Sequence, residues 1–240
     1  MTHWIEQWHR PAHVMAIQTT NSIAQHPSFD VHPKLSKPEL IKQLAAEFDL
    51  PHAPKFLQQV HGNQVVEYTQ QPDSQMTRPA DACFTRSKNV ICAVMTADCL
   101  PVLLTDIAGS FVAAVHCGWR SLYASILRET LKSINSEDQI FAWFGPCIQA
   151  KQYQVDESFV INYLKQHPNS HSAFTTIKAG KSFADLYAMA SIQLNALGVK
   201  RIEAANQCTF LDPNYYSWRQ NNSPKRMASM VWLEPQQSCL

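Results

Sequence analysis

The amino-acid sequence predicts a mixed α/β fold, and two kinds of pattern lead to that class. Residues 90–96, 100–105 and 111–116 are apolar and rich in β-branched side chains, which is typical of strands buried on both faces. Residues 121–134 carry apolar side chains along one helical stripe. Because 45% of the 240 residues are hydrophobic and no repeat or linker interrupts the chain, we expect a single domain over residues 1–240.

The first helix is expected after residue 35, where the least regular part of the sequence ends. Ser36-Lys37-Pro38-Glu39 has the form of a capping box with proline in the first helical turn. Apolar residues then follow at helical spacing as far as Phe48. The sequence therefore predicts a helix that ends near Phe48.

The rest of the chain alternates between expected strands and helices. His61-Gly62-Asn63, with its turn-forming Gly and Asn, separates two short strands. Asp156 is expected to cap a helix that runs to Lys165, and Gly198 stands where a helix C-terminal glycine belongs. The remaining expected strands are 56–61, 64–68, 140–144, 201–205 and 226–233, and the remaining expected helix is 183–197.

The charge and the cysteines limit the classes of partner and the compartment that we expect. The chain has 20 basic and 19 acidic residues without a long run of either sign, so no stripe suited to nucleic acid or to a membrane surface is visible. We therefore expect a small-molecule substrate, no nucleic acid and no membrane. The seven cysteines are odd in number and include no CxxC pair, which favours reduced thiols and a cytoplasmic location.

Three side chains of metal-ligating type stand at the ends of expected strands. They are His61, Cys99 and His116. Imidazole and thiolate are ligands for zinc or copper, and three protein ligands leave a fourth position open for water or substrate. Spacing alone favours hydrogen-bonded histidines and a buried thiol over a metal site, because no close-spaced pair anchors the group.

Further stretches, taken together with these, resemble one known family. The matching segments are Gln59-Val60-His61-Gly62, Arg78-Pro79-Ala80-Asp81-Ala82, residues 94–104 and 113–120, Gly145-Pro146, Cys208-Thr209, Tyr216-Ser217-Trp218-Arg219 and Arg226-Met227-Ala228-Ser229. In this order they resemble the laccase-domain family, the YfiH-like proteins that are described as polyphenol oxidases and as purine nucleoside phosphorylases. The resemblance implies that His61, Cys99 and His116 bind the metal. It also implies two packed mixed β-sheets flanked by helices.

The sequence departs from the family pattern at three places. The usual Thr-Arg-Gly-Gly run near the N-terminus corresponds to Gln18-Thr19-Thr20-Asn21, and the usual Arg-Arg-Asp to Arg219-Gln220-Asn221. Cys117 replaces the usual alanine after the second metal histidine. The expected metal ligands are kept, whereas the pocket is altered.

The activity that the resemblance implies is metal-dependent chemistry on purine nucleosides. It comprises phosphorolysis of adenosine, inosine and methylthioadenosine, and deamination of adenosine to inosine, with Zn²⁺ or copper as the cofactor. Arg120 and Arg219 are the candidate clamp for phosphate. Asp98 is a candidate proton carrier or a partner that orients a ligand histidine. Gln59 and Cys208 are further candidates for substrate binding.

Three other functions stay open. A copper-dependent polyphenol oxidase would use the same ligands with Met95 as a weak axial ligand, although no His-x-His motif of the kind that holds several coppers occurs. A metal-free hydrolase would use Cys99 as nucleophile and His116 or His61 as base. A non-catalytic binding protein is the third, because the N-terminal pocket segment is altered.

Overall fold

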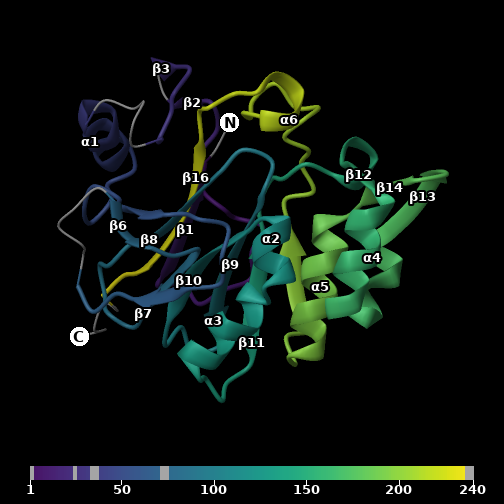
Figure 1. Ribbon diagram of the computed structural model, residues 1–240. Helices are drawn as coiled ribbons and strands as arrows, with labels where there is room; N and C mark the ends of the chain where they lie inside the picture. Colours follow the sequence, from purple (N-terminus) through teal and green to yellow (C-terminus); the bar gives the residue numbers. More distant parts are fainter. Residues whose placement is uncertain (1–2, 24–25, 33–37, 71–75, 236–240) are drawn as a thin grey trace.

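Two β-sheets lie face to face in the centre of the computed structural model, which describes residues 3–23, 26–32, 38–70 and 76–235 (Figure 1). The smaller sheet is antiparallel, in the order β1 (Val14–Gln18), β16 (Met227–Leu233), β8 (Cys92–Thr96). The larger sheet has the order β15 (Arg201–Ala204), β11 (Ile140–Phe144), β9 (Leu100–Asp106), β10 (Val112–Cys117), β7 (Ala82–Thr85), β5 (Val65–Glu67). It is mixed, because β15 and β5 each pair in parallel with their neighbour while the other pairs are antiparallel.

Side-chain alternation along the central strands explains why both faces of the larger sheet are buried. Leu103 and Val112 point toward the smaller sheet and pack with Val94 and Val231 in one apolar cluster. Their neighbours along the strands belong to a second cluster on the opposite face. Successive residues of a strand point to opposite faces, so a continuous apolar run is needed to fill both clusters.

Helices cover the outer faces of the two sheets. The outer face of the larger sheet packs against α3 (Ile126–Ile134) and α5 (Leu186–Ala196), whereas α1 (Pro38–Glu47) packs over the smaller one (Figure 1). The other helices are α2 (Trp119–Tyr123), α4 (Glu157–Gln166) and α6 (Trp218–Asn221), with 3₁₀ turns at Ala150–Gln152 and Pro168–Ala173. The expected architecture of two packed sheets with helices outside is confirmed.

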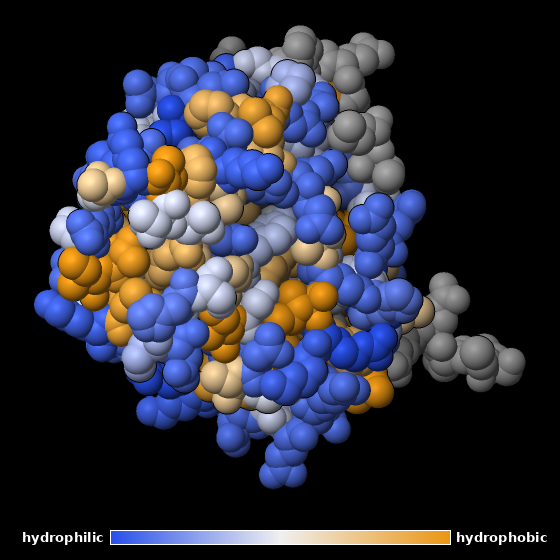
Figure 2. Space-filling view, turned by 90° about the vertical axis from the view of Figure 1, so that its right-hand side faces the viewer, coloured by the Kyte–Doolittle hydropathy of each residue, from blue (hydrophilic) through white to orange (hydrophobic). Residues whose placement is uncertain are grey.

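Smaller sheets complete the periphery. They are β12 (Gln154–Asp156), β14 (Lys181–Ala184) and β13 (Phe174–Lys178), the pair β2 (Ser22–Ile23) and β3 (His26–Pro27), and the pair β4 (Phe56–Gln58) and β6 (Met76–Pro79). On the face that includes α4 and β13, apolar patches interrupt a largely hydrophilic surface (Figure 2). No helix in the described part of the chain is long and apolar enough to cross a membrane.

One expected helix is two helices in the structure. The helix predicted over 121–134 starts earlier, at Trp119, and is broken after Tyr123. Ser125 has a left-handed conformation, with φ of 61°, which no helix interior accommodates. The prediction of one continuous helix was wrong because the apolar stripe continues across a break that no Gly or Pro marks.

Other predicted boundaries shift by a few residues. Phe183 lies in β14, and α5 begins after Asp185, whose carboxylate accepts a hydrogen bond from the Ala188 N–H. The strand predicted over 56–61 ends at Gln58, and His61 lies beyond it with a φ of 60°, which a strand does not accommodate. Asp156 stands at the start of α4 but makes no side-chain cap and pairs with Lys181 instead. Ser36 and Lys37 of the expected capping box lie outside the described residues.

Several strands of the structure were not predicted from the sequence. The most important are β1, in the segment that we considered least regular, and β7, which follows the Arg78-Pro79-Ala80-Asp81 stretch. β7 pairs with β10 and so fixes the chain just before it against the strand that carries His116. This pairing builds the candidate site.

Candidate metal centre and its cavity

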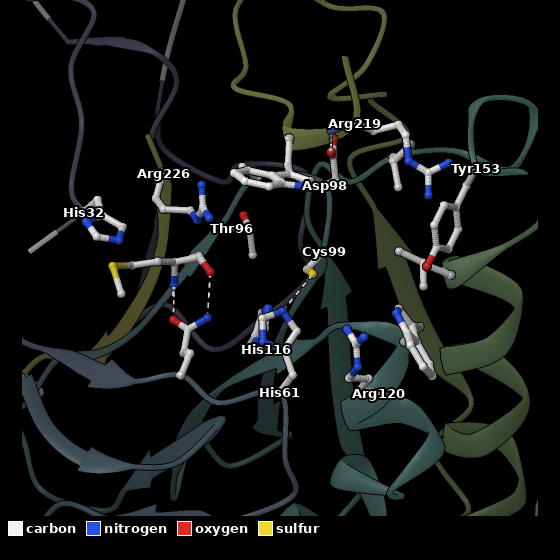
Figure 3. Close-up of a pocket in the computed structure, with 17 residues that line it drawn as sticks. His32, His61, Thr96, Asp98, Cys99, His116, Arg120, Tyr153, Arg219 and Arg226 are labelled. Carbon is white, nitrogen blue, oxygen red and sulfur yellow. Dashed lines mark hydrogen bonds between the residues drawn. The ribbon is translucent and has the colours of Figure 1, made fainter. Parts of the chain in front are cut away.

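His61, Cys99 and His116 come together at one end of the two sheets. His61 lies in the loop after β4, Cys99 in the turn between β8 and β9, and His116 near the end of β10. One ligand atom from each lies within 4.8 Å of the others, and Cys99 Sγ is 3.9 Å from His61 Nε2. In the described residues they form the one group of three or more His, Cys, Asp or Glu side chains placed to hold a metal (Figure 3).

Asp81 fixes the His116 side chain and the backbone of the loop that carries His61. Its buried carboxylate accepts a hydrogen bond from His116 Nδ1 at 2.8 Å, which leaves the other ring nitrogen for a metal. The same carboxylate accepts from the backbone N–H groups of His61 and Gly62, at 2.9 and 2.7 Å. Burial acts to raise the pKa of Asp81, but its bonds and proximity to His116 and the two backbone donors hold it below its usual range.

Gly118 provides the space into which the three side chains fit. A Cβ at this position would lie 3.0 Å from His61 Cδ2 and 3.1 Å from Cys99 Sγ. Gly118 has an ordinary extended conformation, with φ of −66°, so the need for glycine here is one of space and not of backbone angle. The close approach places the start of α2 directly against the candidate ligands.

The electrostatics of the group favour a thiolate. Burial alone would raise the pKa of Cys99, but the neighbouring His116 and His61 lower it to about 6. Burial likewise would lower the pKa of His116, and the charges and hydrogen bonds of Cys99 and Asp81 raise it to about 9. A thiolate is the form of cysteine that binds metals, so the donor set fits zinc or copper.

The three side chains line a cavity of about 490 Å³ that also contains Arg120 and Arg219. Arg120, on α2, lies over the ring of Trp119, with its guanidinium carbon 4.4 Å from the ring centroid. Arg219, on α6, lies over Tyr153 at 5.0 Å and donates to the Gln154 carbonyl. Both guanidiniums lie on the same side of Cys99, opposite Arg226 and His32 (Figure 3).

The structure gives the other predicted site residues different surroundings. Gln59 lines the cavity, and its amide pairs with the backbone of Met95, accepting from the N–H at 2.7 Å and donating to the carbonyl at 2.8 Å. Asp98 accepts from the Thr209 hydroxyl and from the Arg219 N–H, at 2.7 and 2.6 Å, and thereby ties the Cys99 turn to the start of α6. The carboxylate that is hydrogen-bonded to a candidate ligand histidine is that of Asp81.

Two cysteines lie behind the cavity wall. Cys208 is buried and accepts a hydrogen bond from the Gln149 N–H, and it is not among the cavity-lining residues. Cys117 points from β10 into the helix-covered cluster, on the face opposite to His116.

The altered N-terminal segment also lies outside the cavity lining. Thr19 pairs with both the N–H and the carbonyl of Ala228, and the Asn21 amide donates to the Pro213 carbonyl. The lining instead includes Arg226 and Trp218, which we did not predict as site residues although both stand in the matching stretches. It also includes Thr96, whose buried hydroxyl has no hydrogen-bond partner among the described residues.

Fold and site together define the class: an α/β protein with one candidate mononuclear metal centre at the strand ends, inside an arginine-containing cavity. Residues 38–234 match the family described as multi-copper polyphenol oxidoreductase laccase. The chain belongs to this family, the laccase-domain or YfiH-like proteins.

Similar proteins span nearly the whole chain. A purine nucleoside phosphorylase of Haemophilus influenzae is 38% identical, covering 95% of this chain and 97% of its own length. The purine nucleoside phosphorylase YfiH of Escherichia coli strain K12 is 34% identical over 95% of this chain and 98% of its own. The crystal structure of a Neisseria meningitidis protein has a TM-score of 0.86 and 31% identity, and the match covers 98% of this chain and 100% of that one.

Proposed function

We propose that this protein is a metal-dependent purine nucleoside phosphorylase that also deaminates adenosine. Two of the similar proteins carry the name purine nucleoside phosphorylase and match over nearly full length. The observation that carries the proposal is the cavity itself, which combines the three candidate metal ligands with two guanidiniums backed by aromatic rings. Zn²⁺ is the proposed metal, with copper as the alternative.

His61, Cys99 and His116 would hold the metal. When bound there, it would supply Lewis acidity and lower the pKa of a water molecule from 15.7 to about 7, as deamination near neutral pH requires. The protein's own contribution is to fix the donors: Asp81 sets the ring orientation of His116, and Gly118 leaves room for all three. His61 is exposed, so the group is accessible from the cavity.

Arg120 and Arg219 would hold phosphate for phosphorolysis. An oxygen of phosphate forms a bond to ribose C1′, the C1′–N bond breaks, and the base leaves with the electron pair and takes up a proton. Guanidiniums suit this anion because their planar donors match phosphate oxygens. No hydrogen bond or ion pair engages the Arg120 side chain within the described residues, which leaves its donors for a ligand, and the Trp119 ring supports its position.

The experiment is product analysis of the metal-loaded protein with adenosine, with and without phosphate. The proposal predicts adenine with phosphate, inosine without it, and neither with Cys99→Ala. His52→Ala, at an exposed histidine away from the cavity, is the matched control and should retain both activities. Absence of both products at full metal occupancy contradicts the proposal, as does full activity of Cys99→Ala.

Two alternatives each have a specific observation in their favour. The family description favours a copper oxidase, and Met95 lines the same cavity, but dioxygen reduction to water needs several coppers and the described residues offer one candidate group. The lowered pKa of Cys99 and the raised pKa of His116 suit a metal-free Cys–His hydrolase. Oxidation of a phenol by the copper-loaded protein would support the first, and activity that survives chelation would support the second.

A further inference from the structure

Trp218 is an exposed indole at the mouth of the cavity. It lines the cavity and is 52% exposed. Among the large apolar side chains that the described residues expose, it is the one that lines this cavity. Tryptophan presents a large apolar surface, so a ligand that covered the exposed half of the ring would be bound favourably.

Trp218 differs from the other two indole or phenol rings of the lining. The guanidinium carbon of Arg120 lies 4.4 Å from the centroid of the Trp119 ring. That of Arg219 lies 5.0 Å from the centroid of the Tyr153 ring. Within the described part of the chain, no ring contact or guanidinium contact is found at Trp218. Two rings of the cavity therefore support arginines, and the third has its faces available to a planar ligand.

The backbone holds Trp218 at a fixed place relative to Cys99. Trp218 is the first residue of α6, whose N-terminus is capped by Ser217, with its Oγ accepting from the Gln220 N–H at 3.1 Å. The next N–H, that of Arg219, donates to Asp98 Oδ2 at 2.6 Å, and Asp98 immediately precedes Cys99. Although the Trp218 side chain is exposed, the hydrogen bond from Arg219 to Asp98 thus holds the backbone next to Trp218 against the turn that carries Cys99.

We propose that Trp218 is the stacking surface for the purine base of the substrate. This inference rests on the proposed function and names the part of the cavity that selects the base. A base on Trp218 lies in the same cavity as Cys99 and as the Arg219 that would hold phosphate. Stacking favours a larger ring system, so Trp218 selects purine over pyrimidine nucleosides by contact area.

The test is calorimetric binding of free adenine to the metal-loaded protein, compared among wild type, Trp218→Ala and Trp218→Phe. Loss of stacking should weaken adenine binding by about tenfold or more in Trp218→Ala. Phenylalanine keeps a stacking face, so Trp218→Phe should bind adenine within about threefold of wild type. Metal content and phosphate binding should stay unchanged, and Tyr123→Ala, an exposed ring outside this cavity, is the control.

Indole fluorescence provides a second readout that does not depend on the alanine variant folding. Adenine should quench the wild-type fluorescence, and Trp218→Phe should bind adenine with that quenching lost. Quenching retained in Trp218→Phe would place the base elsewhere and overturn the inference, as would equal adenine affinity in wild type and Trp218→Ala, or no adenine binding by wild type.

Turnover separates this inference from the function on which it rests. If Trp218→Ala cleaves adenosine with unchanged KM, the stacking role of Trp218 is contradicted and the phosphorylase proposal is not affected. Adenine binding that depends on Trp218, in a protein that turns over no nucleoside, supports the stacking surface and contradicts the phosphorylase proposal. A raised KM with little change in kcat is the result that we expect.

Discussion

At the residue scale, the candidate centre depends on a side chain that is not one of its three expected ligands. Asp81 bonds to His116 through its carboxylate and to the backbone of the loop that carries His61. The sequence placed Asp81 in a family stretch but did not indicate its partners, because they come from segments 20 and 35 residues away. Asp98 was a candidate for this role or for that of proton carrier because it adjoins Cys99, but its carboxylate bonds to Thr209 and to the Arg219 N–H.

Asp81→Asn should weaken metal binding. The amide keeps the shape of the side chain but replaces one acceptor oxygen by a donor, which cannot serve both His116 Nδ1 and the backbone N–H groups. Loss of such an orienting partner typically costs about 10- to 100-fold in metal affinity. A chelator competition titration measures the effect. Asp138→Asn, at an exposed position, is the control, and equal affinity in both variants would remove the role of Asp81.

Gly118→Ala should also lower metal occupancy, for a steric reason. Its Cβ would meet His61 and Cys99 atoms at 3.0 and 3.1 Å and push the donors apart. Gly62→Ala is a matched control beside the same group, since its Cβ would find ordinary contacts at 3.6 Å. Metal per chain, measured after gel filtration, should fall in the first variant only. Full occupancy of Gly118→Ala would show that the site has more room than the structure indicates.

At the scale of the element, short segments at strand ends build the cavity. The long apolar strands β8, β9 and β10 were predictable from composition because each is buried on both faces. The break between α2 and α3 was not predictable, since Ser125 adopts a left-handed conformation without a Gly or Pro to mark it. That break leaves α2 as a separate short helix, which presents Trp119 and Arg120 to the cavity.

Arg120→Ala should reduce phosphorolysis more than deamination. If the α2 guanidinium holds phosphate, its removal costs charge-assisted hydrogen bonds worth about 1.5–3 kcal/mol, or roughly 10- to 150-fold. Deamination uses no phosphate and should change little. The ratio of adenine to inosine formed from adenosine reports both reactions in one assay. Arg128→Ala, at an exposed arginine on α3, is the control, and equal loss of both reactions in Arg120→Ala would rule out the phosphate role.

At the scale of the whole molecule, two stacked sheets bring distant strands into register at the site. The resemblance predicted this layering, whereas the pattern of apolar residues predicted the strands and not their neighbours. β1 pairs with β16 from the opposite end of the chain, and such long-range pairing leaves no local signal. The cavity residues His32, Trp218 and Arg226 were missed for the same reason: they become neighbours only through that assembly.

Leu103→Ala should destabilise the whole fold without a direct effect on the site. Leu103 is fully buried between the two sheets, and a truncated core leucine typically costs about 2–5 kcal/mol. Leu197→Ala, at a partly exposed position after α5, should cost less than about 1 kcal/mol. Urea unfolding gives both values. A similar loss of unfolding free energy in the two variants would mean that the interface between the sheets is not the main hydrophobic core.

The central claim is that one metal ion, held by His61, Cys99 and His116, is required for nucleoside turnover. The most direct measurement is adenosine turnover by metal-free protein as zinc is added back, with bound metal quantified at each step. The account predicts activity that rises linearly and levels off at one zinc per chain, and no tight zinc binding by Cys99→Ala. Full turnover before any metal is added, or a requirement for several ions per chain, would contradict it.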